Sequence, residues 1–134
     1  GPRGSSDGED GGPARRWFDR RVAGVDEEAG RSLRRLASGR PDAVADVLHM
    51  DPDGEGVTSL ARSTAGLVSL AAVIAVDGPP AELRAQVDAA LRAGADAEDI
   101  VSVLVAVAPH VGASRIVSAA PAILRALEEG PAGR

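Results

Sequence analysis

Apolar residues recur along most of this chain at the three- and four-residue spacing of an amphipathic α-helix. Within residues 80–93, for example, Leu83, Val87, Ala90 and Leu91 fall on one stripe. The sequence contains no segment with the strict alternation of apolar and polar residues that is typical of a half-buried strand. The pattern therefore predicts an all-α fold, a compact bundle of about six helices.

Capping residues, glycines and prolines divide this pattern into elements. Thr58 or Ser59 can cap one helix, and Asp96 with Asp99 forms a capping-box pattern for another, which Pro109 is expected to end. The predicted helices cover residues 26–38, 42–50, 58–76, 80–93 and 96–109, with a last helix after residue 112 and a further short helical pattern between residues 15 and 25.

Two of these helices carry specific expectations about burial. Residues 65–76 are apolar apart from Gly66 and Ser69, so the helix 58–76 is expected to be central and buried on most sides. In the last helix, Pro121 is expected to produce a kink. The stripe predicted to face the core from that helix consists of Ile116, Ala120, Ile123, Leu124 and Leu127.

The composition predicts three parts along the chain. Residues 1–14 are mainly Gly, Ser, Pro and acidic residues, which cannot bury enough apolar surface to offset their ordering entropy. They are expected to form a disordered tail. Residues 15–56 are expected to form an N-terminal helical segment, and residues 57–130 the main helical domain.

The core has to be built almost entirely from aliphatic residues, because Trp17 and Phe18 are the only aromatic residues among 134. Small side chains let helices approach closely, but they bury little apolar area per residue. A domain of this size with such a core is expected to depend on subunit contacts, so we expect a homo-oligomer.

Charge and hydropathy restrict the partners. The formal net charge is −5, with an isoelectric point near 5.0, which argues against nucleic acid as a partner. The sequence has no run of about 18 apolar residues that would span a membrane. Its first residues lack the apolar core of a signal peptide, so a cytoplasmic location is expected.

Missing residue types exclude several chemistries. The chain has no Cys, which excludes thiol peroxidase activity, disulfides and thiolate–metal sites, and no Lys to form a Schiff base. Its only histidines are His49 and His110, too few for a typical metal site. We therefore expect neither a metal nor another cofactor.

The candidate functional residues lie between residues 82 and 115. Glu82 and Gln86, four residues apart, flank the apolar stripe of their helix and can face either a cleft or solvent. His110 can titrate near neutral pH or simply cap a helix C-terminus. Arg115 can hold a substrate carboxylate or face solvent. Ser114 can bind substrate, or it can cap a helix or pack.

Four consecutive motifs, in residues 81–86, 89–94, 95–100 and 110–114, resemble the carboxymuconolactone decarboxylase / alkylhydroperoxidase-D-like family. They read Ala-Glu-Leu-Arg-Ala-Gln, Ala-Ala-Leu-Arg-Ala-Gly, Ala-Asp-Ala-Glu-Asp-Ile and His-Val-Gly-Ala-Ser. The resemblance covers about residues 57–127. It implies a small-molecule site on the helix that carries Glu82, and a helical assembly such as a dimer, trimer or hexamer.

This sequence departs from the family pattern at its reactive positions. The Cys-x-x-Cys pair of the peroxidase branch would fall at Pro79 and Glu82, so disulfide-based peroxide reduction is excluded. Gln86 occupies the place of the decarboxylase histidine and cannot shuttle a proton near neutral pH. Residues 65–67, Ala-Gly-Leu, replace the family's Arg-Glu-Leu, which removes a supporting ion pair.

Two functions remain open. The first is a divergent, cofactor-free enzyme (a lyase, isomerase or cyclase) for a small carboxylated or lactone-type compound. Glu82 would then be the acid or base, assisted by His110, with Gln86, Arg115 and Ser114 binding substrate. The second is a catalytically inactive family member that binds a ligand or serves as an assembly protein. An enzyme needs Glu82 in a closed pocket, whereas an assembly protein leaves it hydrated or paired with an arginine such as Arg84 or Arg115.

The N-terminal helices before residue 50 form a hypothetical cover for the pocket or for a neighbouring subunit. Deletion of residues 1–50 is then expected to lower the melting temperature or the oligomer mass, as measured by thermal denaturation and native mass spectrometry. If neither quantity changes, these helices cover nothing.

Overall fold

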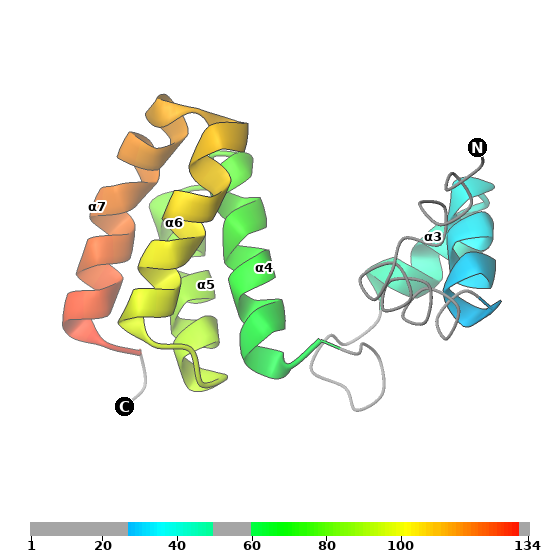
Figure 1. The fold of residues 1–134 in the computed structure, drawn as a ribbon, viewed down its shortest axis with the longest axis horizontal. Coiled ribbons are helices and arrows are strands. Elements are labelled where there is room, and N and C mark those ends of the chain that lie inside the picture. Colours follow the sequence, from blue (N-terminus) through cyan, green and yellow to red (C-terminus); the bar gives the residue numbers. More distant parts are fainter. Residues whose placement is uncertain (1–26, 50–59, 132–134) are drawn as a thin grey trace, which may run out of the picture. The chain divides into compact units, whose positions relative to one another are not determined.

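The computed structural model describes residues 27–49 and 60–131 (Figure 1). Contacts along the chain divide it into two units, Gly1–Met50 and Asp51–Arg134. The described residues form six helices and no strand, which confirms the predicted all-α fold. The predicted tail 1–14, the helical pattern between residues 15 and 25 and the domain boundary at residues 56–57 lie outside the described residues.

The first unit contains a helix over residues 27–37 and α3 (Pro41–Leu48). Gly39 makes the turn between them with a φ of 69°, a conformation that glycine adopts without steric cost. The Arg35 guanidinium bridges to α3, 3.5 Å from Asp42 and 3.1 Å from Asp46. α3 ends two residues before the predicted Met50, which lies outside the described residues.

The second unit is a four-helix bundle of α4 (Arg62–Ala75), α5 (Pro80–Arg92), α6 (Ala97–Val111) and α7 (Ala113–Glu129). Successive helices run in opposite directions (Figure 1). Both α4 and α7 pack against α5 and α6, whereas α5 and α6 lie at diagonal positions. Residues on the facing sides of α4 and α5 are therefore close neighbours, whereas α5 and α6 are in much weaker contact.

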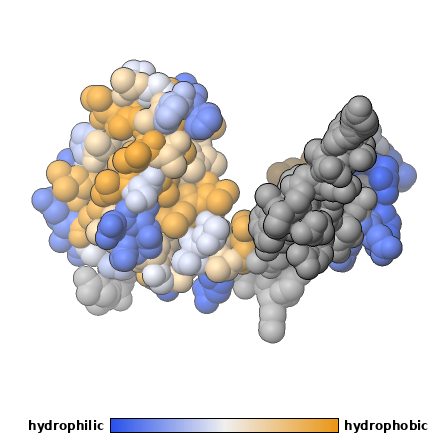
Figure 2. All heavy atoms as spheres, in the orientation of Figure 1, coloured by the Kyte–Doolittle hydropathy of each residue, from blue (hydrophilic) through white to orange (hydrophobic). Residues whose placement is uncertain are grey.

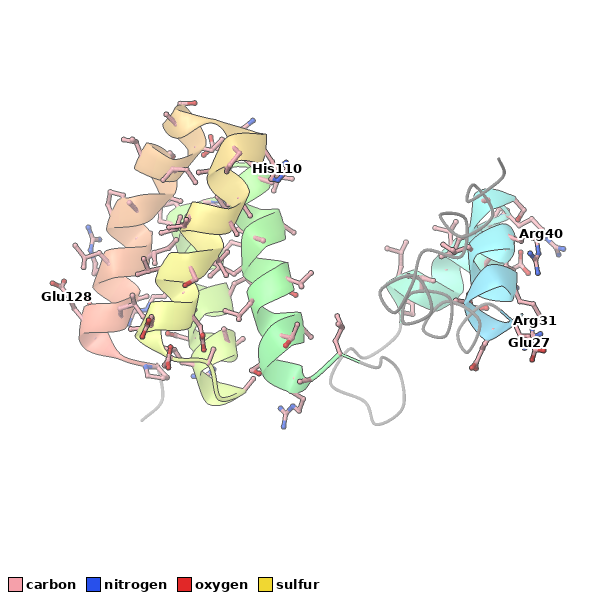
Figure 3. All side chains as sticks on the ribbon, viewed as in Figure 1. Glu27, Arg31, Arg40, His110 and Glu128 are labelled. Carbon is pink, nitrogen blue, oxygen red and sulfur yellow. The ribbon has the colours of Figure 1, made fainter. Side chains whose placement is uncertain are left out.

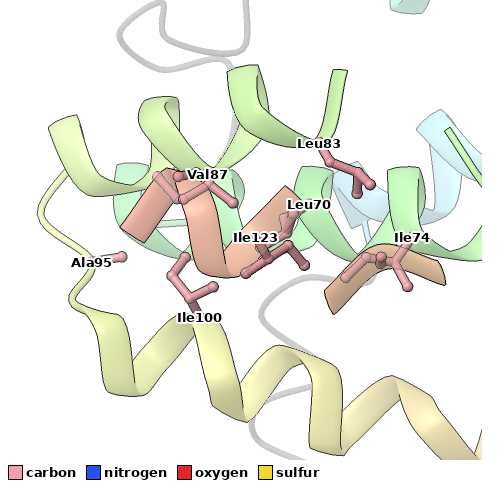
Figure 4. Close-up of a cluster of buried hydrophobic side chains, with 10 residues drawn as sticks. Leu70, Ile74, Leu83, Val87, Ala95, Ile100 and Ile123 are labelled. Atoms are coloured by element: carbon pink, nitrogen blue, oxygen red, sulfur yellow. The ribbon is translucent and has the colours of Figure 1, made fainter. Parts of the chain in front are cut away.

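The core of the bundle consists of aliphatic side chains from all four helices (Figure 4). Four of the core positions are alanines, and the three within helices let the helices approach closely. The largest fully buried side chains are Leu70, Ile74, Val87, Ile100 and Ile123, and the buried helical alanines are Ala90, Ala119 and Ala126.

The start of α6 has the predicted capping box. The backbone N–H of Asp99 donates to Asp96 Oδ1 at 2.8 Å, and the backbone N–H of Asp96 donates to Asp99 Oδ2 at 3.1 Å. The predicted end at Pro109 is wrong, because α6 continues to Val111. The helix ends instead at Gly112, whose φ of 87° breaks the helical path.

The predicted start of α4 lies earlier than the observed one. Its N-cap is Ala61, which offers no side-chain acceptor, whereas Thr58 and Ser59 lie outside the described residues. For a single chain, the expectation that α4 is buried on most sides is wrong. Only Leu70 and Ile74 of this helix are buried, and Val68 is 55% exposed. A helix of a four-helix bundle keeps one outer face, and in α4 that face is apolar.

The core stripe of α7 agrees with the predicted one at Ile116, Ile123 and Leu127, which belong to the core or pack against it, but not at Leu124. Ala119, Ile123 and Ala126 are buried, whereas Leu124 is 58% exposed. The small alanines allow this face to approach its neighbours most closely, so the helix turns them inward instead of Leu124. Pro121 lies inside α7 on the exposed side.

At Gly66 the backbone of α4 lies in close contact with α5. A Cβ atom placed there would lie 3.0 Å from Ala90 Cα and 3.3 Å from Ala90 Cβ. Glycine in the middle of a helix lowers stability by about 1 kcal/mol relative to alanine. Its presence here indicates that close packing of the two helices outweighs this loss of helix propensity. The two helices approach most tightly where a side chain is missing.

Gly66→Ala is expected to lower the free energy of unfolding by about 1 kcal/mol, because overpacking against a backbone atom outweighs the gain in helix propensity. A loss of this size lowers the melting temperature of a small domain by roughly 4–8 °C, measurable by circular dichroism. Gly30→Ala is the control, since a Cβ there would meet only the flexible Arg34 side chain, at 3.4 Å. A melting temperature that stays level or rises in Gly66→Ala would contradict the tight contact.

Candidate functional site

A groove of about 280 Å³ runs along the outer side of the contact between α4 and α5. Small side chains at the edge of this contact leave the space unfilled, and polar or charged side chains border it. The small residues are Ala65, Gly66, Ala89 and Ala93, and the polar or charged ones are Arg62, Ser69, Gln86 and Arg92.

Of the predicted pair Glu82 and Gln86, only Gln86 lines this groove. Gln86 is half-buried and lines it, and its Nε2 donates a hydrogen bond to Glu82 Oε1 at 3.2 Å. Glu82 is one turn nearer the start of α5 and is exposed within one chain.

Arg115 and Ser114 lie apart from the groove, at the start of α7. Arg115 Nη1 is 3.4 Å from Asp77 Oδ2, and Ser118 Oγ donates to Asp77 Oδ1 at 3.0 Å. Asp77 itself has a φ of 56°, in the turn between α4 and α5. These contacts tie that turn to α7, so the guanidinium of Arg115 has a structural partner. Ser114 is exposed.

His110 is exposed near the end of α6 (Figure 3). Its helix is diagonal to α5 in the bundle, and no hydrogen bond between described residues joins His110 to Glu82. Among the five predicted site residues, the hydrogen bonds of the described part of the chain join only Glu82 to Gln86. His110, Ser114 and Arg115 lie on α6 and α7 instead.

Sequence reasoning missed a buried acid on α5. Asp88 is 4% exposed, and its Oδ2 lies 3.9 Å from Arg84 Nε. Arg84 also forms an ion pair with Glu129 of α7, so the three side chains link the two helices. The four-residue spacing of Arg84 and Asp88 was the available signal. Arg84 is thereby paired with these acids rather than with Glu82.

The arginines of the groove were missed as well. Arg62 begins α4 and Arg92 ends α5, thirty positions apart in the sequence. They lie on the same groove because the helices are antiparallel neighbours in a register that places Gly66 against Ala90. The spacing of residues within one helix carries no signal for the register between two helices.

In the stretches 27–49 and 60–131, no three side chains of His, Cys, Asp or Glu gather as a metal site would require. Across these stretches, none of the helices combines the length and apolar character needed to cross a membrane.

Comparison with known proteins identifies one family. The model of the Carboxymuconolactone decarboxylase family matches residues 48–125, which is more than half of the chain. The matched range includes α4, α5 and α6 and therefore the whole groove. Searches of curated proteins and of solved structures returned no match.

Proposed function

Because the chain belongs to the carboxymuconolactone decarboxylase family, we propose that it is a cofactor-free acid/base enzyme for a small carboxylated or lactone-type compound. The substrate lies in the α4–α5 groove and undergoes a lyase, isomerase or cyclase reaction without any thiol step. The observation that carries this proposal is the hydrogen bond between Gln86 and Glu82 at the groove.

The chemistry follows from what these two groups can do. The Glu82 carboxylate accepts a proton from the carbon next to the substrate carbonyl and later returns it to the product. The Gln86 amide has two N–H donors, and one of them stabilises the enolate oxygen that forms in between. A positioned acid or base of this kind contributes about 10²–10⁴-fold to the rate.

Proton transfer by Glu82 requires that water be excluded from the groove, because a hydrated carboxylate is a weak base. Within one chain Glu82 is exposed. The cover we propose is a second copy of the chain, packed on the outer face of α4 beside the groove. The enzyme is then a homo-oligomer whose assembly completes the site.

Self-association is supported by apolar surface that a single chain leaves uncovered. Between Arg62 and Asp77 the sequence has no ionisable residue, and Val68 and Val76 of this stretch are exposed. Apolar side chains also gather on the face of the bundle that carries α6 (Figure 2). On that helix Val101 and Val105 are exposed. Association would remove these side chains from water.

Glu82→Gln tests the catalytic role. It keeps the size of the side chain and its contact with Gln86 but removes the base, so turnover is expected to fall at least 100-fold while ligand binding persists. Turnover and thermal shift are measured on a panel of small carboxylates, lactones and keto acids. Glu128→Gln, which neutralises an exposed acid on α7, is the matched control and retains activity.

The alternative is a catalytically inactive member of the family that binds a ligand or serves as an assembly protein. The exposure of Glu82 favours it. In that case wild type turns over no compound of the panel, and Glu82→Gln is as stable as wild type or more so. Turnover that survives in Glu82→Gln would contradict the role of Glu82, though not the role of the groove.

Val68→Glu tests the assembly. A carboxylate at the centre of an apolar contact is costly to bury, so this variant is expected to shift from oligomer to monomer in light scattering coupled to size-exclusion chromatography. Ala85→Glu adds the same charge at an exposed position of α5 that does not line the groove, and it is expected to keep the mass of wild type. Equal masses for all three proteins would place the contact elsewhere.

A further inference from the structure

The groove is cationic at one end. Arg62 and Arg92 both line it, and none of the acidic residues in the stretches 27–49 and 60–131 does. Since Gly66 lies against Ala90, the first turn of α4 and the last turn of α5 are at the same end of the groove, and the two arginines lie there together. The whole chain carries a formal charge of −5, so this end has the opposite sign to the protein as a whole.

This local charge has physical consequences for a ligand. A cleft lined by one sign of charge and walled by apolar groups raises the local concentration of ions of the other sign. Arginine presents two parallel N–H donors that match the two oxygens of a carboxylate. Arg92 makes a further interaction within the chain, so Arg62 is the arginine on which recognition depends, and Arg92 contributes charge beside it.

We infer that Arg62, with Arg92 beside it, binds the carboxylate of an elongated ligand whose far end reaches Gln86, the hydrogen-bond partner of Glu82. This inference rests on the proposed function, because it places that substrate along the same groove. It also replaces Arg115 as the residue that selects carboxylates, since Arg115 is paired with Asp77 at the start of α7.

The helix sets the length of such a ligand. Gln86 and Arg92 are six residues apart on α5, which corresponds to about 9 Å along the helix axis. Between them the groove is walled by Ala65, Gly66 and Ala89. The structure thus favours an acid of about six carbons, with a carboxylate at one end, an apolar middle, and a carbonyl or hydroxyl at the other.

Three probes of one carbon skeleton test this assignment: 6-hydroxyhexanoate, 6-hydroxyhexanamide and ε-caprolactone. Each is titrated into the full-length chain, and the backbone amide signals of Gln86 and Ala89 are followed by NMR. In wild type the carboxylate is expected to bind about tenfold more tightly than the amide, because its hydrogen bonds to arginine are charge-assisted. Raising the salt concentration should weaken binding of the carboxylate alone.

Arg62→Gln is expected to abolish the preference for carboxylate over amide, leaving the two dissociation constants within about twofold. Arg125→Gln is the matched control, since it removes the same charge from an exposed position on α7 outside the groove, and it should keep the preference. The assignment is overturned if the preference is absent in wild type, or if both variants reduce it equally.

The probes also separate the two proposals. If the amide and the lactone shift the groove signals as strongly as the carboxylate, the groove is a ligand site, and only the proposed role of Arg62 is contradicted. If none of the three probes shifts the amide signals of Gln86 or Ala89, the groove binds no compound of this class. Both the proposed function and the inference are then contradicted.

Discussion

The contact of Gly66 with Ala90 is the constraint on which the bundle and its site depend. With no side chain at residue 66, the backbones of α4 and α5 come close enough that an added Cβ would lie 3.0 Å from Ala90 Cα. That contact fixes the register of the two antiparallel helices. The register in turn places Arg62 near Arg92 and opens the groove that Gln86 lines. A larger residue at position 66 would push α4 away from α5, and its side chain would also occupy space in the groove.

The sequence predicts features that lie within one helix better than features that join two helices. The capping box of Asp96 and Asp99 and the hydrogen-bonded pair of Glu82 and Gln86 follow from spacings of three and four residues. The grouping of Arg62 with Arg92 depends on the register between α4 and α5. The ion pair between Arg115 and Asp77 depends on the contact between the α4–α5 turn and α7. Neither is encoded in the periodicity of a single segment.

Local rules also failed where tertiary structure outweighs propensity. Pro109 lacks one backbone donor but does not end α6, which stops at Gly112, where the backbone conformation itself changes. The apolar run of α4 predicts a helix covered on most sides, yet a bundle of four helices leaves one face of each helix outside. The apolar composition of a helix face predicts that the face is covered, but it does not identify the surface that covers it.

The small residues that allow the close contact also leave apolar side chains on the surface of the single chain. Alanine and glycine at the helix contacts bury little apolar area, while larger side chains such as Val68 and Val105 remain exposed. The same small residues leave the groove open, and Glu82, the exposed hydrogen-bond partner of Gln86, does not line it. One additional surface, supplied by another copy of the chain, would remove the apolar faces from water and the carboxylate from solvent together. Stability and acid/base chemistry would then have the same physical origin, because both require that this side of α4 and α5 be covered.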